Sequence, residues 1–262
     1  MYKTLNPRPL IDAANLCLTY KNQSGNVMSI IDDISVQLEY GEVIAIIGPS
    51  GSGKSCLLRL LAGVELPSSG EVSYNFGNDL DWPAVPIVLQ TPALLPWRTV
   101  RENIQLGLEI GNRSSSGDDA VTDIIHSVGL NGFEEFLPKA LSGGMKARVS
   151  IARALIGNAP VVLFDEAFTE LDECTRRRLT TLFSTQVEQR KMSAVIVSHN
   201  IDEAVFLADR LFILTPRPAK IDSVINIGLP RPRCDAIWQS RTFTDLVANV
   251  RNRIEKLWSL SA

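Results

Sequence analysis

The sequence predicts an α/β fold: a core of buried strands and helices, with an antiparallel β subdomain near the N-terminus and an inserted α-helical subdomain. Three observations lead to this prediction. The apolar run Val43–Ile47 is followed by a glycine-rich turn and then by an apolar, helix-forming stretch. Residues 10–47 alternate between apolar and polar positions, and residues 91–159 show a mostly helical pattern.

The N-terminal region alternates its residues as half-buried antiparallel strands do. The segments 16–20 and 34–38 show this pattern most clearly. Tyr20 stands at the end of the first segment, where an aromatic side chain either fills the core or meets a ligand.

A glycine-rich turn follows the strand at 43–47. It reads Gly48-Pro49-Ser50-Gly51-Ser52-Gly53-Lys54-Ser55, and the apolar segment Cys56–Leu61 continues it as a helix. The glycines let the backbone N–H groups point inward, and the helix adds the positive end of its dipole. Lys54 can then reach the β- and γ-phosphates of a nucleotide, and the Ser55 hydroxyl can ligate Mg²⁺. The segment predicts a phosphate-binding loop (P-loop) rather than a Gly/Ser linker that happens to hold a lysine.

The helical region at 91–159 is interrupted by the polar stretch 111–117, which predicts an exposed loop. Near its end stands Leu141-Ser142-Gly143-Gly144-Met145, followed by a helical pattern. Ser142 occupies the position of an N-cap, and Gly143 and Gly144 let a phosphate approach the helix start.

Two carboxylates end the apolar strand that follows. In the run Val161–Glu166, Asp165 is placed to hold Mg²⁺ and Glu166 to face an attacking water. Gln90 and His199 each follow an apolar strand. Each alone is an ordinary polar residue, but in this order and context they indicate nucleotide hydrolysis.

The C-terminal part continues the α/β pattern with a helix from Asp202, a strand at 211–214 and an amphipathic helix at 241–262. The apolar face of the last helix is expected to dock on the core rather than on a membrane. Its members are Phe243, Leu246, Val250, Ile254 and Leu257.

At these motifs the chain resembles the ATP-binding cassette (ABC) ATPases over nearly its whole length, and Leu141–Met145 matches the signature motif of that family. The resemblance implies a RecA-like P-loop NTPase fold in a single domain spanning 1–262. Its ATP-binding core with the β subdomain takes 1–90 and 160–240, the helical subdomain 91–159, and the C-terminal helix 241–262. No Asn-Lys-x-Asp motif is present, which argues against a GTPase.

The resemblance also implies the cofactors ATP and Mg²⁺ and a set of site residues. Glu166, His199 and Gln90 are the expected catalytic residues, and Ser55, Gln90 and Asp165 the expected metal-binding residues. Nucleotide binding is expected from Tyr20 stacked on adenine, from Gly48, Pro49, Ser50, Gly51, Ser52, Gly53, Lys54, Ser55 and Cys56, and from Ser142, Gly143 and Gly144.

In this family the signature motif of one copy contacts the γ-phosphate held by Lys54 of another, so ATP is expected to join two chains head to tail. The pair is a homodimer or includes a homologous ABC subunit, and Leu171-Asp172 matches the loop that crosses the interface. The sequence departs from the family at Ala167, where proline is usual, and at Glu170, where a small residue is usual. Cys56 replaces a more frequent threonine but keeps the backbone N–H.

Composition limits the partners and the compartment. A net charge of −3 and a pI near 5.5 give no broad basic surface for nucleic acid. The four cysteines are widely spaced, which fits neither a disulfide framework nor a metal site and suits a reducing compartment. Without a signal pattern or a membrane-spanning run, the protein is expected to lie peripherally on the cytoplasmic face of the inner membrane, attached through a partner.

Two segments, 90–104 and 215–221, look like importer ATPases for nitrate, sulfonate, taurine, bicarbonate and related small solutes. The implied partners are two membrane permease subunits and, indirectly, a solute-binding protein. Leu94, Leu95 and Trp97 either form an apolar docking patch for the permease or fill the subdomain core.

The sequence thus predicts the ATP-hydrolysing subunit of an importer. The alternatives are a soluble ABC ATPase of DNA repair, translation or cofactor assembly, and a module that binds ATP without hydrolysing it. One cassette without a coiled-coil insertion argues against the first alternative, and the presence of Glu166, Gln90 and His199 argues against the second. None of the residues is expected to touch the solute, so the sequence does not identify it.

Overall fold

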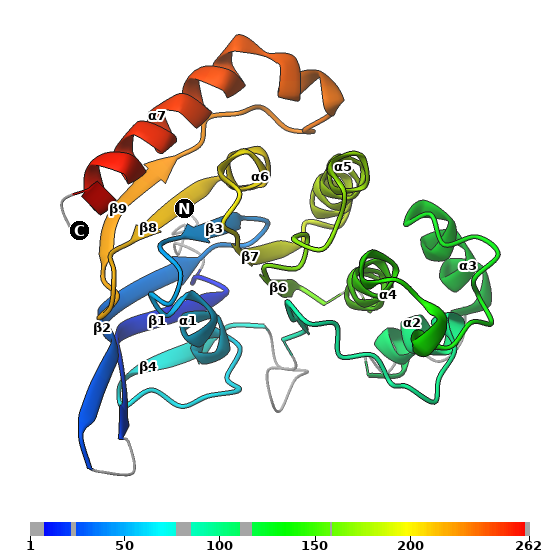
Figure 1. The fold of residues 1–262 in the computed structure, drawn as a ribbon, viewed down its shortest axis with the longest axis horizontal. Helices are drawn as coiled ribbons and strands as arrows, with labels where there is room; N and C mark the ends of the chain where they lie inside the picture. Colours follow the sequence, from blue (N-terminus) through cyan, green and yellow to red (C-terminus); the bar gives the residue numbers. More distant parts are fainter. Residues whose placement is uncertain (1–7, 22–24, 77–84, 111–116, 158, 260–262) are drawn as a thin grey trace, which may run out of the picture.

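The protein is described from a computed structural model, which covers residues 8–21, 25–76, 85–110, 117–157 and 159–259. Figure 1 shows a central sheet with helices on its two faces, an antiparallel sheet at one side and a group of helices at the other. The α/β fold expected from the sequence is confirmed.

The N-terminal sheet is antiparallel. It consists of β1 (Ile11–Lys21), β2 (Val27–Leu38) and β4 (Ser69–Tyr74) in the order β2-β1-β4. Burial alternates over 16–20 of β1 and 34–38 of β2, as the sequence predicts, and register shifts interrupt the alternation elsewhere. An isolated parallel bridge between Ile31 and Ala219 links β2 to the segment that connects β8 with β9.

The central sheet has six strands in the order β5-β6-β7-β3-β8-β9. Neighbouring strands run parallel, except that β9 is antiparallel to β8. Helices cover both faces of such a sheet, which explains why its inner strands are continuous apolar runs. The strands are β3 (Val43–Ile47), β5 (Ile87–Val88), β6 (Val161–Asp165), β7 (Ser193–Val197), β8 (Arg210–Leu214) and β9 (Ile221–Asn226).

The helices fall into two groups along the chain. Those of the predicted helical subdomain are α2 (Val100–Ile110), α3 (Gly117–Ser127), the 3₁₀ turn η1 (Pro138–Ala140) and α4 (Gly143–Ile156). The others are α1 (Lys54–Leu61), α5 (Glu173–Arg190), α6 (Ile201–Leu207), the 3₁₀ turn η2 (Asp235–Gln239) and α7 (Arg241–Ser259).

The division of the chain at residues 90, 160 and 240 stays a prediction. The exposed loop predicted at 111–117 lies outside the described residues except for Gly117, which already belongs to α3. Residues 260–262 of the predicted terminal helix also lie outside them.

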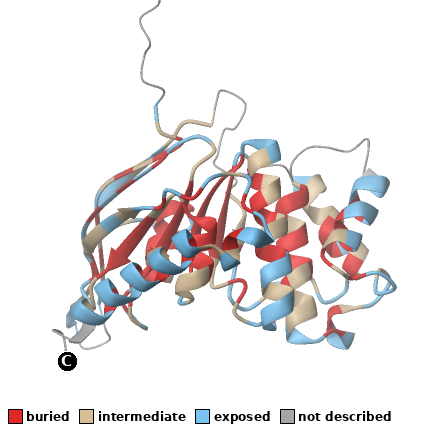
Figure 2. Ribbon diagram, turned by 90° about the horizontal axis from the view of Figure 1, so that it is seen from above, coloured by how far each residue is buried: buried red, intermediate tan, exposed pale blue. Residues whose placement is uncertain are grey.

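Successive residues of the buried strands face opposite sides of the sheet, and each side has its own core. Ile44 and Ile46 of β3 pack with α1 and the antiparallel sheet. Val43, Ala45 and Ile47 pack with the helices on the other face. Figure 2 shows the central strands as the most buried part of the fold. The sheet therefore holds the P-loop, which follows β3, between two packed layers.

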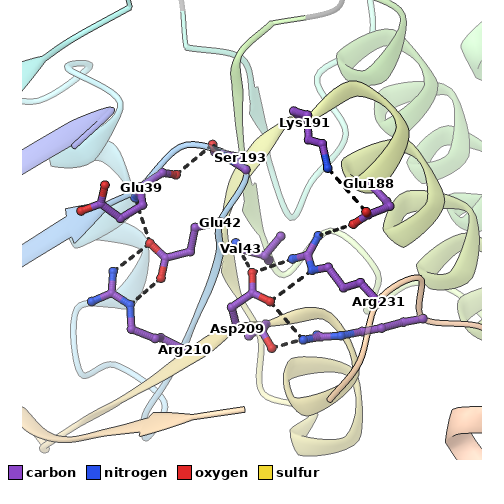
Figure 3. A network of polar contacts seen from close by, with 12 residues as sticks. Glu39, Glu42, Val43, Glu188, Lys191, Ser193, Asp209, Arg210 and Arg231 are labelled. Atoms are coloured by element: carbon purple, nitrogen blue, oxygen red, sulfur yellow. Dashed lines mark hydrogen bonds and ion pairs between the residues drawn. The ribbon is translucent and has the colours of Figure 1, made fainter. Parts of the chain in front are cut away.

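A polar network closes the end of the sheet opposite the P-loop (Figure 3). Asp209 accepts from the backbone N–H of Val43 at 2.9 Å and pairs with Arg231 at 2.5 Å and Arg233 at 3.1 Å. The buried Arg233 also donates to the carbonyl oxygens of Phe206 and Ala208 at 2.7 and 2.8 Å. Burial lowers the pKa of Arg233 to about 10, so the guanidinium stays charged at neutral pH. These contacts fix β3 and β8 at their amino ends.

The C-terminal helix docks on the core, as its apolar face predicts. Phe243, Val250 and Ile254 are buried in the larger core cluster, and Leu246 and Leu257 pack against it. None of the helices in the described ranges is both long enough and apolar enough to cross a bilayer.

Candidate active site

The P-loop joins the carboxyl end of β3 to the first turn of α1. Gly51 and Gly53 have φ angles of 74° and 115°, a region in which other residues are strained. A Cβ at Gly48 would lie 3.1 Å from the Cβ of Leu214 on the adjacent strand β8. The Ser52 hydroxyl is buried and has no hydrogen-bond partner within the described part of the chain. Glycine therefore stands at the positions where the backbone adopts a positive φ angle or passes close to the sheet.

Lys54 lies at the centre of this loop and is 6% exposed. Its ammonium group donates to the carbonyl oxygens of Gly48 and Pro49, both at 3.0 Å. Burial lowers the pKa of Lys54, while the nearby carboxylates of Glu166 and Asp165 raise it. A buried cation held by two neutral carbonyls is well suited to bind a phosphate anion.

A cavity of about 360 Å³ opens above the loop. It brings together residues from the P-loop, from the ends of β5 and β6 and from the β8–β9 connection. Its lining consists of Ser50, Gly51, Gly53, Lys54, Ser55, Cys56, Gln90, Glu166 and Arg217.

Asp165 and Ser55 meet beside this cavity. The Ser55 hydroxyl donates to Oδ1 of Asp165 at 2.8 Å. Burial raises the pKa of Asp165, and the hydrogen bond from Ser55 opposes the shift. Among the described residues no cluster of three or more His, Cys, Asp or Glu could hold a metal ion unaided. One carboxylate and one hydroxyl fit Mg²⁺, which commonly takes few protein ligands and completes its shell with phosphates and water.

Glu166 is the meeting point of the predicted catalytic residues. Its Oε2 accepts from Nε2 of Gln90 at 3.3 Å and lies 3.3 Å from Nδ1 of His199. Its φ angle is 49°, which is uncommon for a residue other than glycine and recurs at functional sites. The backbone N–H of Glu166 donates to the carbonyl of Val197, so β7 fixes this turn. Three strands far apart in sequence thus place their polar end residues around one carboxylate.

Tyr20 does not fill the core, because it is 41% exposed. Its hydroxyl donates to Glu65 and lies 3.9 Å from the thiol of Cys56, a cavity residue. Arg59 pairs with the same Glu65 at 3.2 Å. The hydrogen bond to Glu65, with burial, raises the pKa of Tyr20 to about 12. Stacking of Tyr20 on adenine stays a prediction. No sequence pattern indicates that Glu65 and Arg59 lie beside Tyr20.

The signature motif begins α4 as expected. The Ser142 hydroxyl accepts from the backbone N–H of Met145 at 3.3 Å, which is the N-cap bond. Ser142, Gly143 and Gly144 are absent from the described residues that line the cavity. In Figure 1, α4 lies on the other side of β6 from α1. One chain therefore does not bring the motif to its own P-loop.

The unusual Glu170 lies against this motif. A Cβ at Gly143 would be 3.4 Å from Oε2 of Glu170, and one at Gly144 would be 3.3 Å from its carbonyl oxygen. The exposed carboxylate thus borders the surface formed by the two glycines.

The sequence also did not identify Arg217 as a site residue. It belongs to the segment 215–221, which resembles importer ATPases, but no periodicity or motif indicates where its side chain lies. The pairing of β8 with β3, and the return of the chain toward β2, bring it to the cavity.

Comparison with known proteins places this site in a family. Residues 31–169 match the family described as ABC transporter. An aliphatic sulfonates import ATP-binding protein, SsuB 2 of Burkholderia cenocepacia, is 40% identical over 207 residues, which cover 78% of this chain and 75% of the relative. The SsuB protein of Bacillus cereus is 36% identical over 239 residues, covering 90% and 93% of the two chains.

The fold has a solved counterpart. The post-hydrolysis dimer of the ATP-binding cassette MJ0796 bound to ADP and Pi superimposes with a TM-score of 0.75 at 27% identity, over 84% of this chain and all of the other. That structure shows the fold with nucleotide. Family match, relatives and architecture agree, and the chain therefore belongs to the ABC transporter family as an ATP-hydrolysing subunit.

Proposed function

We propose that this subunit powers the import of a small solute, an aliphatic sulfonate or a related small anion, through partner membrane subunits. Two lines of evidence support this. Two relatives are named for aliphatic sulfonate import, and this chain matches 75% and 93% of their length. The site also has the residues for turnover, since Gln90 and His199 converge on Glu166 beside the buried Lys54.

In the proposed cycle the P-loop N–H groups and Lys54 bind the phosphates. Ser55, Asp165 and Gln90 would hold Mg²⁺, which supplies charge neutralisation for the phosphates. Glu166 accepts a proton from the attacking water, and Gln90 and His199 orient the carboxylate and the water. Electrostatic positioning of this kind supplies most of the catalysis in phosphoryl transfer.

The signature motif has its role in a dimer. Ser142, Gly143 and Gly144 lie away from the cavity of their own chain and are exposed or half-buried. We assign them to the γ-phosphate bound by a second copy, or by a homologous subunit. Their position at the start of α4 gives this surface free N–H groups and a positive helix end.

A patch for the permease lies beyond the Gln90 loop. Trp97 is 71% exposed, while Leu94 packs against the core. Leu95 is half-buried, and its backbone N–H donates to Asn103 at 2.8 Å. The docking patch is thus narrower than Leu94, Leu95 and Trp97 together, with Trp97 as its exposed member. Contact there would hold the subunit peripherally at the cytoplasmic membrane face, with a solute-binding protein acting from the other side.

The direct test is reconstitution of the chain with its candidate permease in proteoliposomes. ATP hydrolysis should rise when a loaded solute-binding protein is added, and labelled aliphatic sulfonate should accumulate. Taurine, nitrate and bicarbonate serve as competing solutes to define the class. Hydrolysis that ignores permease and binding protein, but responds to DNA or ribosomes, would favour the soluble alternative.

A further inference from the structure

A guanidinium that lies outside the P-loop, the signature motif and the strand-end carboxylates is present at the nucleotide cavity. Arg217 stands between β8 and β9 and lines the cavity of about 360 Å³ together with Lys54. Its Nη2 donates to the carbonyl oxygen of Gly51 at 2.6 Å, and its Nη1 lies 3.3 Å from Sδ of Met28. The side chain therefore contacts the P-loop itself.

The segment that carries Arg217 is tied to its surroundings. The backbone N–H of Lys220 donates to the Thr215 hydroxyl at 3.0 Å, which closes the turn. The fully buried Ala219 donates to Ile30 at 2.8 Å and accepts from Asp32 at 3.0 Å. Lys220 pairs with Asp32 at 2.8 Å. Since β2 and β8 both hold this turn, the guanidinium is presented at the cavity by a fixed backbone.

The charges of the cavity favour an added anion. Its lining contains two cations, Lys54 and Arg217, and one carboxylate, Glu166. Within the described ranges Arg217 makes no ion pair, whereas Arg59, next to the same cavity, is paired with Glu65. A guanidinium has five N–H donors, and the Gly51 carbonyl and the Met28 thioether take one each. The others are available for phosphate oxygens, whose spacing suits two parallel hydrogen bonds.

We propose that Arg217 binds the phosphate groups of the nucleotide, as a second cation beside Lys54. The hydrogen bond to Gly51 keeps the guanidinium at the P-loop before nucleotide arrives. The inference rests on the proposed nucleotide site and adds a residue that acts on the same substrate from outside the P-loop.

Calorimetric titration of the full chain with ATP, ADP and adenosine tests the proposal. R217Q is expected to weaken binding of both ATP and ADP about tenfold, as loss of a charge-assisted hydrogen bond does. Adenosine binding should be unchanged, because adenosine has no phosphate. R217K keeps the charge without the planar fork and should lie between R217Q and the unmodified chain, which also serves if R217Q folds poorly.

The control is R241Q, which removes the same charge from a side chain that is 95% exposed on α7, and should bind all three ligands normally. Equal weakening of ATP and adenosine by R217Q would mean that Arg217 only shapes the loop, and unchanged ATP binding would remove it from the site. Lys54→Ala tests the nucleotide site independently of Arg217. If this variant keeps full ATP affinity, the nucleotide site itself is misplaced; if it loses ATP while R217Q does not, Arg217 alone is wrongly assigned.

Discussion

At the scale of single residues, the candidate catalytic side chains lie at the ends of buried strands. Glu166 follows β6, Gln90 follows β5, and His199 follows β7 by two residues. Parallel strands end at the same edge of a sheet, so residues separated by 33 to 76 positions become hydrogen-bonding neighbours.

Glu166 is expected to be the general base. Glu166→Gln removes the negative charge and preserves the shape, so the variant should bind ATP nearly normally. Hydrolysis should fall by about 10²-fold or more, the range typical for loss of a general base. Steady-state phosphate release measures this, and ATP-bound dimers should accumulate on size-exclusion chromatography. Near-normal turnover would exclude the role.

Cys56 offers a chemical probe of the same cavity. Its thiol is half-buried, lines the cavity and accepts from Nη2 of Arg59 at 3.3 Å. Maleimide is expected to label Cys56 in the empty protein and to block hydrolysis. Nucleotide at about ten times its Kd should slow labelling about tenfold, because only the free fraction reacts.

Mass spectrometry of the digested protein follows Cys56 and compares it with Cys174, which is exposed and lies outside the cavity. Cys174 should react at the same rate with and without Mg·ATP. An unreactive Cys56 beside a reactive Cys174 would show a thiol packed too tightly to attack.

At the scale of elements, polar side chains cap the starts of α4, α5 and α6. Asn200 caps α6 by accepting from the backbone N–H of Glu203 at 3.1 Å. Glu203 itself is 3% exposed and lies in the first turn of α6, four residues after His199. The sequence pattern predicts this helix, but not that its first turn buries a carboxyl group.

This buried carboxyl group should make stability depend on pH. Burial raises the pKa of Glu203 from 4.5 to about 7, against the opposing effects of the Ser198 hydrogen bond and Arg176. The folded protein therefore binds more protons than the unfolded chain between these values, and stability falls as pH rises through them. Above pH 7 the penalty is fully present, on the order of 3 kcal/mol at 1.36 kcal/mol per pKa unit.

Glu203→Gln is neutral at every pH and should remove this contribution. Urea unfolding at pH 5 and pH 8 is expected to show a smaller loss of stability for the variant than for the unmodified chain. Glu255→Gln, on the exposed side of α7, is the matched control and should follow the unmodified chain. Parallel curves for all three proteins would contradict the assignment.

At the scale of the whole molecule, we expect coupling to the membrane partner to depend on Trp97. A large exposed aromatic that becomes buried at an interface can carry about 2 kcal/mol or more of binding energy. Trp97→Ala is therefore expected to weaken assembly with the permease and to lower solute uptake. Its ATP hydrolysis in isolation should change little, because Trp97 does not line the nucleotide cavity.

Co-purification with the permease and thermal melting decide between the two roles of this side chain. With 71% of Trp97 exposed, the melting temperature should barely change. A large drop in melting temperature would mean that Trp97 stabilises the subunit itself. Leu94, which packs against the core, should show such a drop on replacement by alanine.

Patterns contained within a short segment could be predicted from the sequence. The alternation of β1 and β2, the glycines of the P-loop, the N-cap of α4 and the apolar face of α7 all follow from local geometry. Their physical basis is the fixed side-chain period of strands and helices and the backbone freedom of glycine.

Only the tertiary structure decided which distant residues share a site. The strand order of the central sheet brings Gln90 and His199 to Glu166. The packing of the other elements leaves Tyr20 exposed beside Glu65 and keeps Ser142 away from the P-loop of its own chain. Arg217 lies at the cavity because backbone hydrogen bonds hold its turn against β2, which is about 190 residues earlier in the sequence. The sequence determined the family and the motifs, whereas long-range packing decided their geometry, because no local pattern encodes which strand edges meet.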